Sequence, residues 1–376
     1  MQIWDANSGE QIRTLRLPKG TGGASGLPVL SPDGRTLYAP LYKYQATAKR
    51  KDGKAGYHYE VDGEITVWDI ASGQQLPSLK QSPPHAVTAV RLSPDGTLLL
   101  SHEIVNGDAT SPPKVLTQWD LRTGEHHRLL DGAWLPVFAP DGKTLAASSA
   151  GLVNEGKILL WDVVLGKERL VLVEEQKGRV AATAFSPDGH YLAGIRDFRD
   201  NAQPPEVKIW DVNTGKEVAS VTTPKGTTLF RRPGLISIAV GAPKFSPDGR
   251  WLAAYLLTGR VYLYDVAERK LAWSKDVKNG WLRELAFSPD GRWLAVAGQD
   301  SPEDLRPREE ISPFDLPQPR IFLFDMKAVG QMEEIVAPHG LIGRLAFSPD
   351  GKTLALGGTG CVWLFDVSRP VNRDQK

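Results

Sequence analysis

The sequence predicts an all-β protein made of seven four-stranded antiparallel sheets, and two repeated patterns carry this prediction. The segment FSPDGRWLA occurs twice without change, at 245–253 and 287–295, and shorter copies run along the whole chain. Between these copies lies a second pattern, an aromatic residue followed by Asp and usually by a Gly-containing turn. A unit of about 42 residues with four short strands is typical of a propeller blade, so we expect a seven-bladed β-propeller.

The SPDG segment has the chemistry of a tight reversal between two strands. Ser suits the first position of a type I turn, Pro fixes φ at the second, and Gly takes the left-handed conformation that follows. We expect a three-residue hairpin loop with a bulge between short apolar strands. The turn begins at Ser31, Ser93, Ser186, Ser246, Ser288 and Ser348, and an APDG copy begins at Ala139.

The aromatic–Asp pattern predicts where the third strand of each blade ends. Turn segments such as DIASGQ and DVNTGK follow it and lead into the fourth strand. The aromatic side chain is expected to pack against the neighbouring blade. The Asp residues of this pattern are Asp5, Asp69, Asp120, Asp162, Asp211, Asp265, Asp325 and Asp366.

Together the FSPDG and WDxxTGK motifs resemble those of the bacterial WD-repeat β-propeller family over nearly the whole chain. Members of that family often carry a Gly-His pair before the first strand, and its His forms a hydrogen-bonded tetrad with the Trp and Asp. Here only His85 and His339 lie near that place, and neither follows Gly. We therefore expect the tetrad to be absent and apolar packing to hold neighbouring blades together.

The order of the strands predicts how the ring closes. Two strands, Met1–Trp4 and Gln11–Leu17, precede the seven repeats, and the last repeat ends on its third strand, Cys361–Phe365. We expect Gln11–Leu17 to supply the missing fourth strand and cover an open edge. Residues 1–367 would then form one propeller domain, followed by a polar tail at 368–376. An eight-bladed ring that lacks two strands is the alternative, and the half repeat at the start suggests a fragment of a longer protein.

Composition narrows the classes of function. The formal net charge is +1, which does not imply bulk attraction to nucleic acid or to an anionic membrane. A single cysteine, Cys361, excludes an intrachain disulfide and fits a reducing compartment, so we expect a cytoplasmic protein. No run of about 20 apolar residues is present, so no membrane span is predicted.

Extra residues gather in loops between the second and third strands and between blades, which share one face of a propeller. The longest insertions are 43–59, 222–242 and 299–319; the first two are basic and aromatic, and the third is acidic and proline-rich. Insertions confined to one face mark the face that is free to specialise. The candidate partner-binding residues are Tyr44, Lys49, Arg50, Lys51, Tyr57, His58, Phe198, Phe230, Arg231, Arg232, Arg306 and Arg308.

These features favour a non-catalytic scaffold that binds a protein or peptide on the insertion-bearing face. A nucleic-acid-binding propeller that uses the basic and aromatic loops is one alternative. A propeller hydrolase with an axial active site is another, with His102, Asp197 and Asp200 as the positions to inspect. Inner strands such as 180–185 and 341–347 look ordinary, however, and no catalytic, cofactor or metal motif is present.

Overall fold

In the computed structural model the chain divides into two compact units, Met1–Val173 and Glu174–Lys376. The described part of the chain contains no helix that is long and apolar enough to cross a membrane. That residues 1–367 form one domain stays a prediction. The structure describes residues 1–5, 8–16, 28–51, 54–82, 85–105, 107–109, 114–149, 157–172, 179–197, 206–222, 242–256, 259–277, 281–299, 318–328, 331–338, 340, 342–358 and 361–368.

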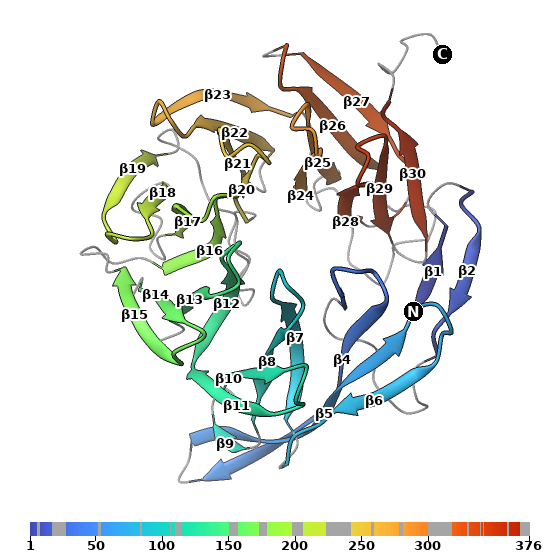
Figure 1. Cartoon of the computed structure of the whole chain (residues 1–376), viewed down its shortest axis with the longest axis vertical. Helices are drawn as coiled ribbons and strands as arrows, with labels where there is room; N and C mark the ends of the chain where they lie inside the picture. Colours follow the sequence, from blue (N-terminus) through green and yellow to red (C-terminus); the bar gives the residue numbers. More distant parts are fainter. Residues whose placement is uncertain are drawn as a thin grey trace. The chain divides into compact units, whose positions relative to one another are not determined.

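The first unit holds the first fifteen strands of the chain (Figure 1). They are β1 (Gln2–Trp4), β2 (Gln11–Thr14), β3 (Val29–Leu30), β4 (Thr36–Lys51), β5 (Lys54–Asp69), β6 (Gln75–Leu79), β7 (Ala86–Leu92), β8 (Leu98–Ile104), β9 (Gly107–Ala109), β10 (Lys114–Asp120), β11 (His126–Asp131), β12 (Ala133–Phe138), β13 (Thr144–Ser149), β14 (Ile158–Asp162) and β15 (Lys167–Leu172).

The second unit holds the remaining strands. They are β16 (Arg179–Phe185), β17 (Tyr191–Asp197), β18 (Glu206–Asp211), β19 (Glu217–Thr222), β20 (Lys244–Phe245), β21 (Trp251–Tyr255), β22 (Arg260–Asp265), β23 (Lys270–Asp276), β24 (Trp281–Phe287), β25 (Trp293–Gln299), β26 (Pro319–Asp325), β27 (Met332–Val336), β28 (Ile342–Phe347), β29 (Thr353–Gly358) and β30 (Val362–Asp366).

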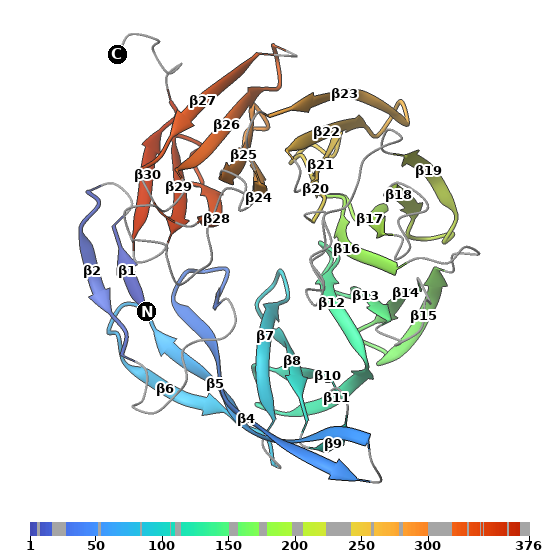
Figure 2. The ribbon, with the colours of Figure 1, turned by 180° about the vertical axis from the view of Figure 1, so that it is seen from behind.

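Seven antiparallel sheets follow one another along the chain, and we number them blades 1 to 7. The first unit contains blade 1 (β3-β4-β5-β6), blade 2 (β7-β8-β10-β11) and blade 3 (β12 to β15). The second contains blade 4 (β16 to β19), blade 5 (β20 to β23), blade 6 (β24 to β27) and the three-stranded blade 7 (β28 to β30), and Figure 2 shows the same strands from behind. The predicted fold class, an all-β seven-bladed propeller with four-stranded antiparallel blades, is confirmed, with three strands in blade 7 among the described residues.

The SPDG turn of blade 2 shows why this segment reverses the chain. Gly96 has a φ of 72° and donates its N–H to the Ser93 carbonyl at 2.9 Å, as in a type I turn. The hairpin closes where Ser93 N donates to Leu98 O at 2.8 Å, so the loop has four residues, 94–97, and the expected three-residue loop is wrong. The extra residue lets Thr97 N donate to the Asp95 carboxylate at 3.1 Å, while Ser93 Oγ donates to the same oxygen.

Successive SPDG turns also touch one another within each unit. A Cβ placed on Gly96 would lie 2.8 Å from Pro32 of blade 1, and one on Gly142 would lie 3.6 Å from Pro94 of blade 2. The same contact, between the glycine of one turn and the proline of the preceding turn, recurs in blades 5, 6 and 7. The Gly of each turn is needed for its positive φ, and in these five blades it also contacts the Pro of the preceding turn.

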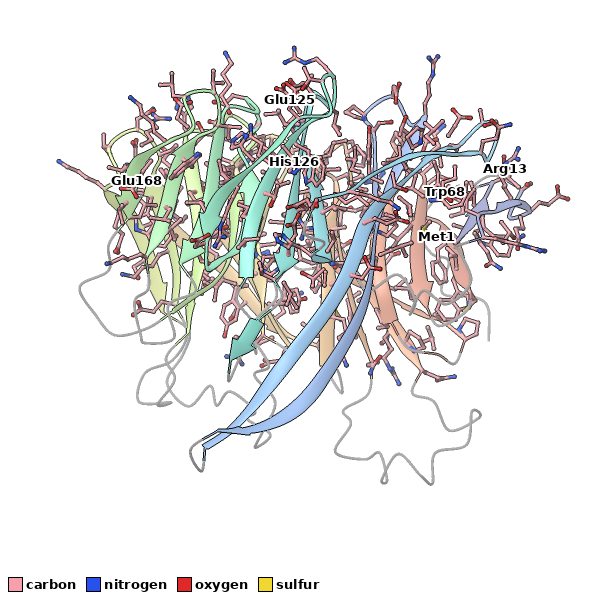
Figure 3. The ribbon with its side chains drawn as sticks, turned by 90° about the horizontal axis from the view of Figure 1, so that it is seen from below. Met1, Arg13, Trp68, Glu125, His126 and Glu168 are labelled. Atoms are coloured by element: carbon pink, nitrogen blue, oxygen red, sulfur yellow. The ribbon has the colours of Figure 1, made fainter. Side chains whose placement is uncertain are left out.

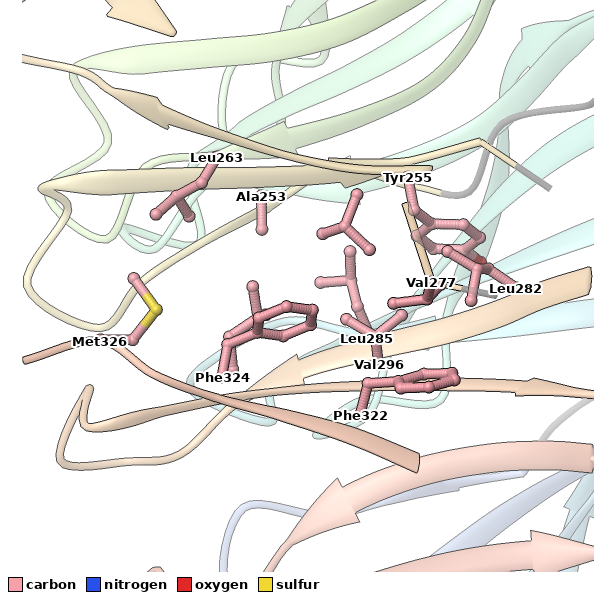
Figure 4. Packing of buried hydrophobic residues seen from close by; sticks show 12 residues of the cluster. Ala253, Tyr255, Leu263, Val277, Leu282, Leu285, Val296, Phe322, Phe324 and Met326 are labelled. Carbon is pink, nitrogen blue, oxygen red and sulfur yellow. The ribbon is translucent and has the colours of Figure 1, made fainter. Parts of the chain in front are cut away.

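Apolar packing between adjacent blades forms the core, as expected. Between blades 5 and 6, Leu263 of β22 and Leu285 of β24 are fully buried and pack with Phe324 of β26 (Figure 4). Similar clusters join blades 4 and 5, and blades 6 and 7. Because adjacent blades bury their facing side chains against each other, removing a large side chain from one blade leaves a cavity that is lined by two blades.

The N-terminal strands form a two-stranded antiparallel sheet, β1 with β2. Arg13 of β2 ties this sheet to the β5–β6 turn, because its guanidinium donates to the carbonyls of Ser72 at 2.7 Å and Ala71 at 2.9 Å. β2 is shorter than the strand Gln11–Leu17 that we expected. Closure of the last blade by this strand stays a prediction.

Candidate interaction site

The hairpin of blade 1 is much longer than any other in the described part of the chain. β4 and β5 pair without interruption from Thr36 opposite Asp69 to Lys51 opposite Lys54. Figure 3 shows the two strands extending well beyond the other strands of the first unit. The predicted insertion 43–59 is therefore built as a continuation of two blade strands. We call residues 43–61 of this hairpin the arm.

A segment of blade 2 lies along one edge of the arm. β9, which follows β8 after a short break, pairs antiparallel with β5, placing Ala109 opposite Tyr57 and Gly107 opposite Tyr59. The backbone of one blade therefore adds a strand to the insertion of its neighbour. This contact fixes the arm to two blades at once.

Glycine at position 63 lets the base of the arm approach blade 2 closely. A Cβ on Gly63 would lie 2.5 Å from the carbonyl oxygen of His85 and 3.1 Å from the backbone nitrogen of Val87. Side-chain carbon atoms do not approach backbone atoms this closely, so any other residue would push β5 away from β7. The glycine is a packing requirement, since its φ is not in the left-handed region.

Beneath this contact lies a buried carboxylate, Glu103 of β8, whose side chain is completely buried. His85 Nδ1 lies 2.8 Å from Oε2, Gln81 Nε2 donates at 2.6 Å, and Thr117 Oγ1 donates at 3.1 Å. Ser101 Oγ also donates to Glu103. A buried carboxylate is stable only when several donors replace the lost water, and here the donors come from strand, loop and neighbouring strand.

The network continues to the tryptophan of the repeat, which corrects an expectation. Trp119 Nε1 donates to Ser101 Oγ at 2.8 Å, so the chain of bonds runs from Trp119 through Ser101 and Glu103 to His85. The expected absence of a tetrad is therefore wrong in blade 2. The sequence analysis expected a His preceded by Gly and an Asp as the acidic residue. In blade 2 the His is His85, which does not follow Gly, and the acidic residue is Glu103, two positions after Ser101.

Comparing the repeats position by position shows that only blade 2 has the residues for this hydrogen-bond network. The residue eight positions after the start of the turn motif is Ser101 in blade 2, but Ala, Gly, Val or Leu in the other blades. Only blade 2 has a carboxylate, Glu103, ten positions after that start. In blade 1 the equivalent tryptophan, Trp68, instead bonds to Thr66 on its own strand at 3.1 Å. In blade 3, Trp161 Nε1 is buried, and no described residue accepts a hydrogen bond from it.

In the second unit, the inner strands carry charges that the sequence analysis had read as ordinary. Glu284 of β24 has a side chain that is 9% exposed and lies between two cations. Lys244 of β20 approaches Oε1 at 2.9 Å, and Arg344 of β28 pairs with Oε2. This ion triple joins blades 5, 6 and 7.

Nearby, burial raises the pKa of the Tyr255 hydroxyl, which donates a hydrogen bond to the Arg283 carbonyl.

The structure places only some of the predicted partner-binding residues. Tyr44, Lys49, Arg50 and Lys51 lie on β4, and Tyr57 and His58 lie on β5, so six of them share the arm. The remaining candidates fall outside the described residues; they are Phe198, Phe230, Arg231, Arg232, Arg306 and Arg308.

Among the residues that the structure describes, no group of three or more His, Cys, Asp or Glu side chains could hold a metal ion. His102, one of the positions to inspect for a hydrolase, has its Nδ1 2.7 Å from Thr88 Oγ1 on the adjacent strand. Asp197 ends β17, and Asp200 lies outside the described residues. In the first unit, the arm and its anchor in blade 2 therefore remain the candidate interaction site.

Comparisons with known proteins agree with this fold. A family model described as "WD domain, G-beta repeat" matches residues 274–301, which include all of β24 and β25. Two solved structures show the same fold. One is titled "Crystal Structure of Mitotic Checkpoint Complex" (TM-score 0.56, 17% identity, 92% of this chain and 87% of the other). The other is titled "Kuenenia stuttgartiensis Hydrazine Synthase" (TM-score 0.54, 19% identity, 74% and 75%).

Curated relatives are similar at low identity. An "Uncharacterized WD repeat-containing protein" of Deinococcus radiodurans is 25% identical over 205 residues, covering 49% of this chain and 70% of the relative. "Transcription initiation factor TFIID subunit 5" of Caenorhabditis elegans is 26% identical over 188 residues, and "Periodic tryptophan protein 2" of Arabidopsis thaliana is 23% identical over 228 residues. These two matches cover 49% and 58% of this chain but only 24% and 22% of the relatives' lengths. The repeats, the blades and these matches show a β-propeller that contains a WD-repeat segment at 274–301 and is similar to WD-repeat proteins.

Proposed function

We propose that this protein is a non-catalytic scaffold that binds a protein or peptide partner through the arm of blade 1. WD-repeat propellers are typically protein-interaction scaffolds, and the insertions of this chain lie between the second and third strands of its blades or between blades. The arm is the largest of these insertions that the structure describes. The cytoplasm is the proposed compartment.

One observation carries this proposal: the arm is held by two blades. β9 pairs with β5, Gly63 lies against the His85 backbone, and His85 is bonded to the buried Glu103. A loop that served only to connect two strands would need no such anchoring. Rigid presentation of a binding segment reduces the ordering cost of association.

The names of the relatives add limited support. TFIID subunit 5 is named as a subunit of a transcription initiation factor, and one structural neighbour is titled as a checkpoint complex. Those names describe proteins in assemblies. For this chain we propose only the general mode of action, a propeller that brings another protein into a complex.

Affinity capture combined with chemical cross-linking tests this proposal. Full-length protein is compared with a variant in which residues 43–59 are replaced by a two-residue turn, using extract of the source organism. We expect a partner whose cross-links map to the arm and that is lost with the shortened variant. A matched control, Arg122→Ala with Lys167→Ala, changes an exposed residue in the third-to-fourth-strand turn of blade 2 and the exposed first residue of β15 in blade 3, and should keep the partner. Equal capture by all three proteins would contradict the proposal.

A further inference from the structure

The two edges of the arm differ. The β5 edge is already occupied, because β9 pairs with it from Tyr57 to Tyr59. The β4 edge pairs with β3 only at Leu37 and Tyr38, and among the described residues no strand pairs with this edge from 43 to 51. This stretch is nine residues long, or roughly 30 Å of strand. An edge of this length presents a row of backbone donors and acceptors to any strand that can approach it.

Charge selects which strand can approach. Residues 43–54 contain five basic residues, Lys43, Lys49, Arg50, Lys51 and Lys54, against one carboxylate, Asp52, which gives a formal charge of +4. Basic residues on an edge strand repel a second copy of the same edge, so they oppose self-association. An extended segment rich in Asp and Glu would instead be attracted. The strand that already lies on the other edge, β9, carries an acidic residue, Asp108, opposite His58.

From these two observations we infer that the β4 edge of the arm binds an extended acidic segment of a partner protein by adding it as a further antiparallel or parallel strand. Backbone hydrogen bonds to residues 43–51 supply the affinity, and the basic residues select acidic sequences. This inference rests on the proposed function and specifies the chemistry of the partner. The arm would then carry β9 on one edge and the partner strand on the other.

Fluorescence anisotropy with the full-length protein tests the inference. The probe is a labelled decapeptide of alternating Glu and Val. The comparison decapeptide contains five Glu, two Val and three Pro in a different order, with prolines at both odd and even positions so that both of its edges are interrupted. Proline lacks the N–H that a ladder needs, so we expect the second peptide to bind at least tenfold more weakly. Equal binding of the two peptides would mean attraction by charge alone and would overturn the inference.

Protein variants locate the site. Lys49→Glu with Lys51→Glu should weaken binding of the Glu-Val peptide at least tenfold. Lys143→Glu with Lys167→Glu makes the same charge change at two exposed positions of blade 3 and should leave the binding unchanged. Thermal melts of both variants confirm folding, and Lys49→Gln with Lys51→Gln replaces the first variant if its melting temperature falls. Equal loss in arm and control variants would overturn the inference.

The outcomes separate this inference from the scaffold proposal. If a captured partner requires the arm but the Glu-Val peptide does not bind, the inference is wrong and the scaffold proposal stands. If neither a partner nor the peptide depends on the arm, both are wrong. Concentration-dependent dimerisation abolished by Lys49→Glu with Lys51→Glu would show that a second copy occupies the edge, and this too would overturn the inference.

Discussion

The indole Nε1 of Trp119 donates a hydrogen bond to Ser101 Oγ at 2.8 Å, and both side chains are buried in blade 2. The hydroxyl of Ser101 therefore stands between the tryptophan of the repeat and the buried Glu103. Through this bond Trp119 of β10 joins the network around Glu103. Glu103 lies on β8, the strand that precedes β9 and therefore anchors it. The strength of the anchor depends on every donor around Glu103 remaining in place.

Replacing Ser101 with Ala should destabilise the protein by about 1–3 kcal/mol, because the Trp119 N–H loses its partner in a buried position and Glu103 loses one donor. Urea unfolding measures the change. Ser220→Ala, at an exposed position of β19, is the control and should change stability by less than about 0.5 kcal/mol. If both variants unfold at the same urea concentration, the network does not stabilise the fold.

Substitution of Gly63 with Ala should separate the base of the arm from blade 2. The added methyl group would lie 2.5 Å from the His85 carbonyl oxygen, so β5 must shift, at a cost of about 1–3 kcal/mol. Amide hydrogen exchange should rise in β9 and in the adjoining part of β5. Gly357→Ala is the matched control, since its Cβ would meet backbone atoms of Arg344 only at 3.6 Å. Unchanged exchange in β9 would contradict the proposed anchor.

In the ion triple of the second unit, removing the two cations should lower the free energy of unfolding more than removing the carboxylate. Removing both cations, Lys244→Ala with Arg344→Ala, leaves the carboxylate of Glu284 buried without its partners and should cost about 1–3 kcal/mol. Glu284→Ala should cost less, about 1 kcal/mol, because the two cations are 40% and 59% exposed and regain water. Urea unfolding of both variants gives the comparison, and the reverse order would contradict this account.

Acid should remove the stabilisation that comes from the SPDG carboxylates. The Ser288 hydroxyl, which donates to Asp290, holds the pKa of that carboxyl below its ordinary value of 3.8. A lowered pKa in the folded state adds stability that is present above the ordinary value and is lost as the pH falls through the lower one. The difference in stability between the wild type and Asp290→Asn should therefore be constant from pH 7 to 5 and shrink towards pH 3. A difference that does not change with pH would exclude this role for Asp290.

The sequence by itself determined the repeat and hence the fold class. Local chemistry sufficed, because each SPDG turn is made by neighbouring residues such as Ser93, Asp95 and Gly96, and each strand ends at its aromatic–Asp pair. It also located the insertion at 43–59 in blade 1, since residues beyond the short repeat must lengthen a loop or a strand. That this insertion continues β4 and β5 as paired strands could not be read from its mixed composition.

Only the tertiary structure decided which residues meet. His85 and Glu103 are 18 positions apart, and Glu284 and Arg344 are 60 apart on different blades. Such contacts depend on the stacking of sheets, which periodicity alone does not fix. For the same reason the sequence did not show why residue 63 is Gly. Only the structure shows that a side chain there would collide with the His85 backbone. Repetition in the chain specifies the blades, and packing between them makes blade 2 the anchor of the arm.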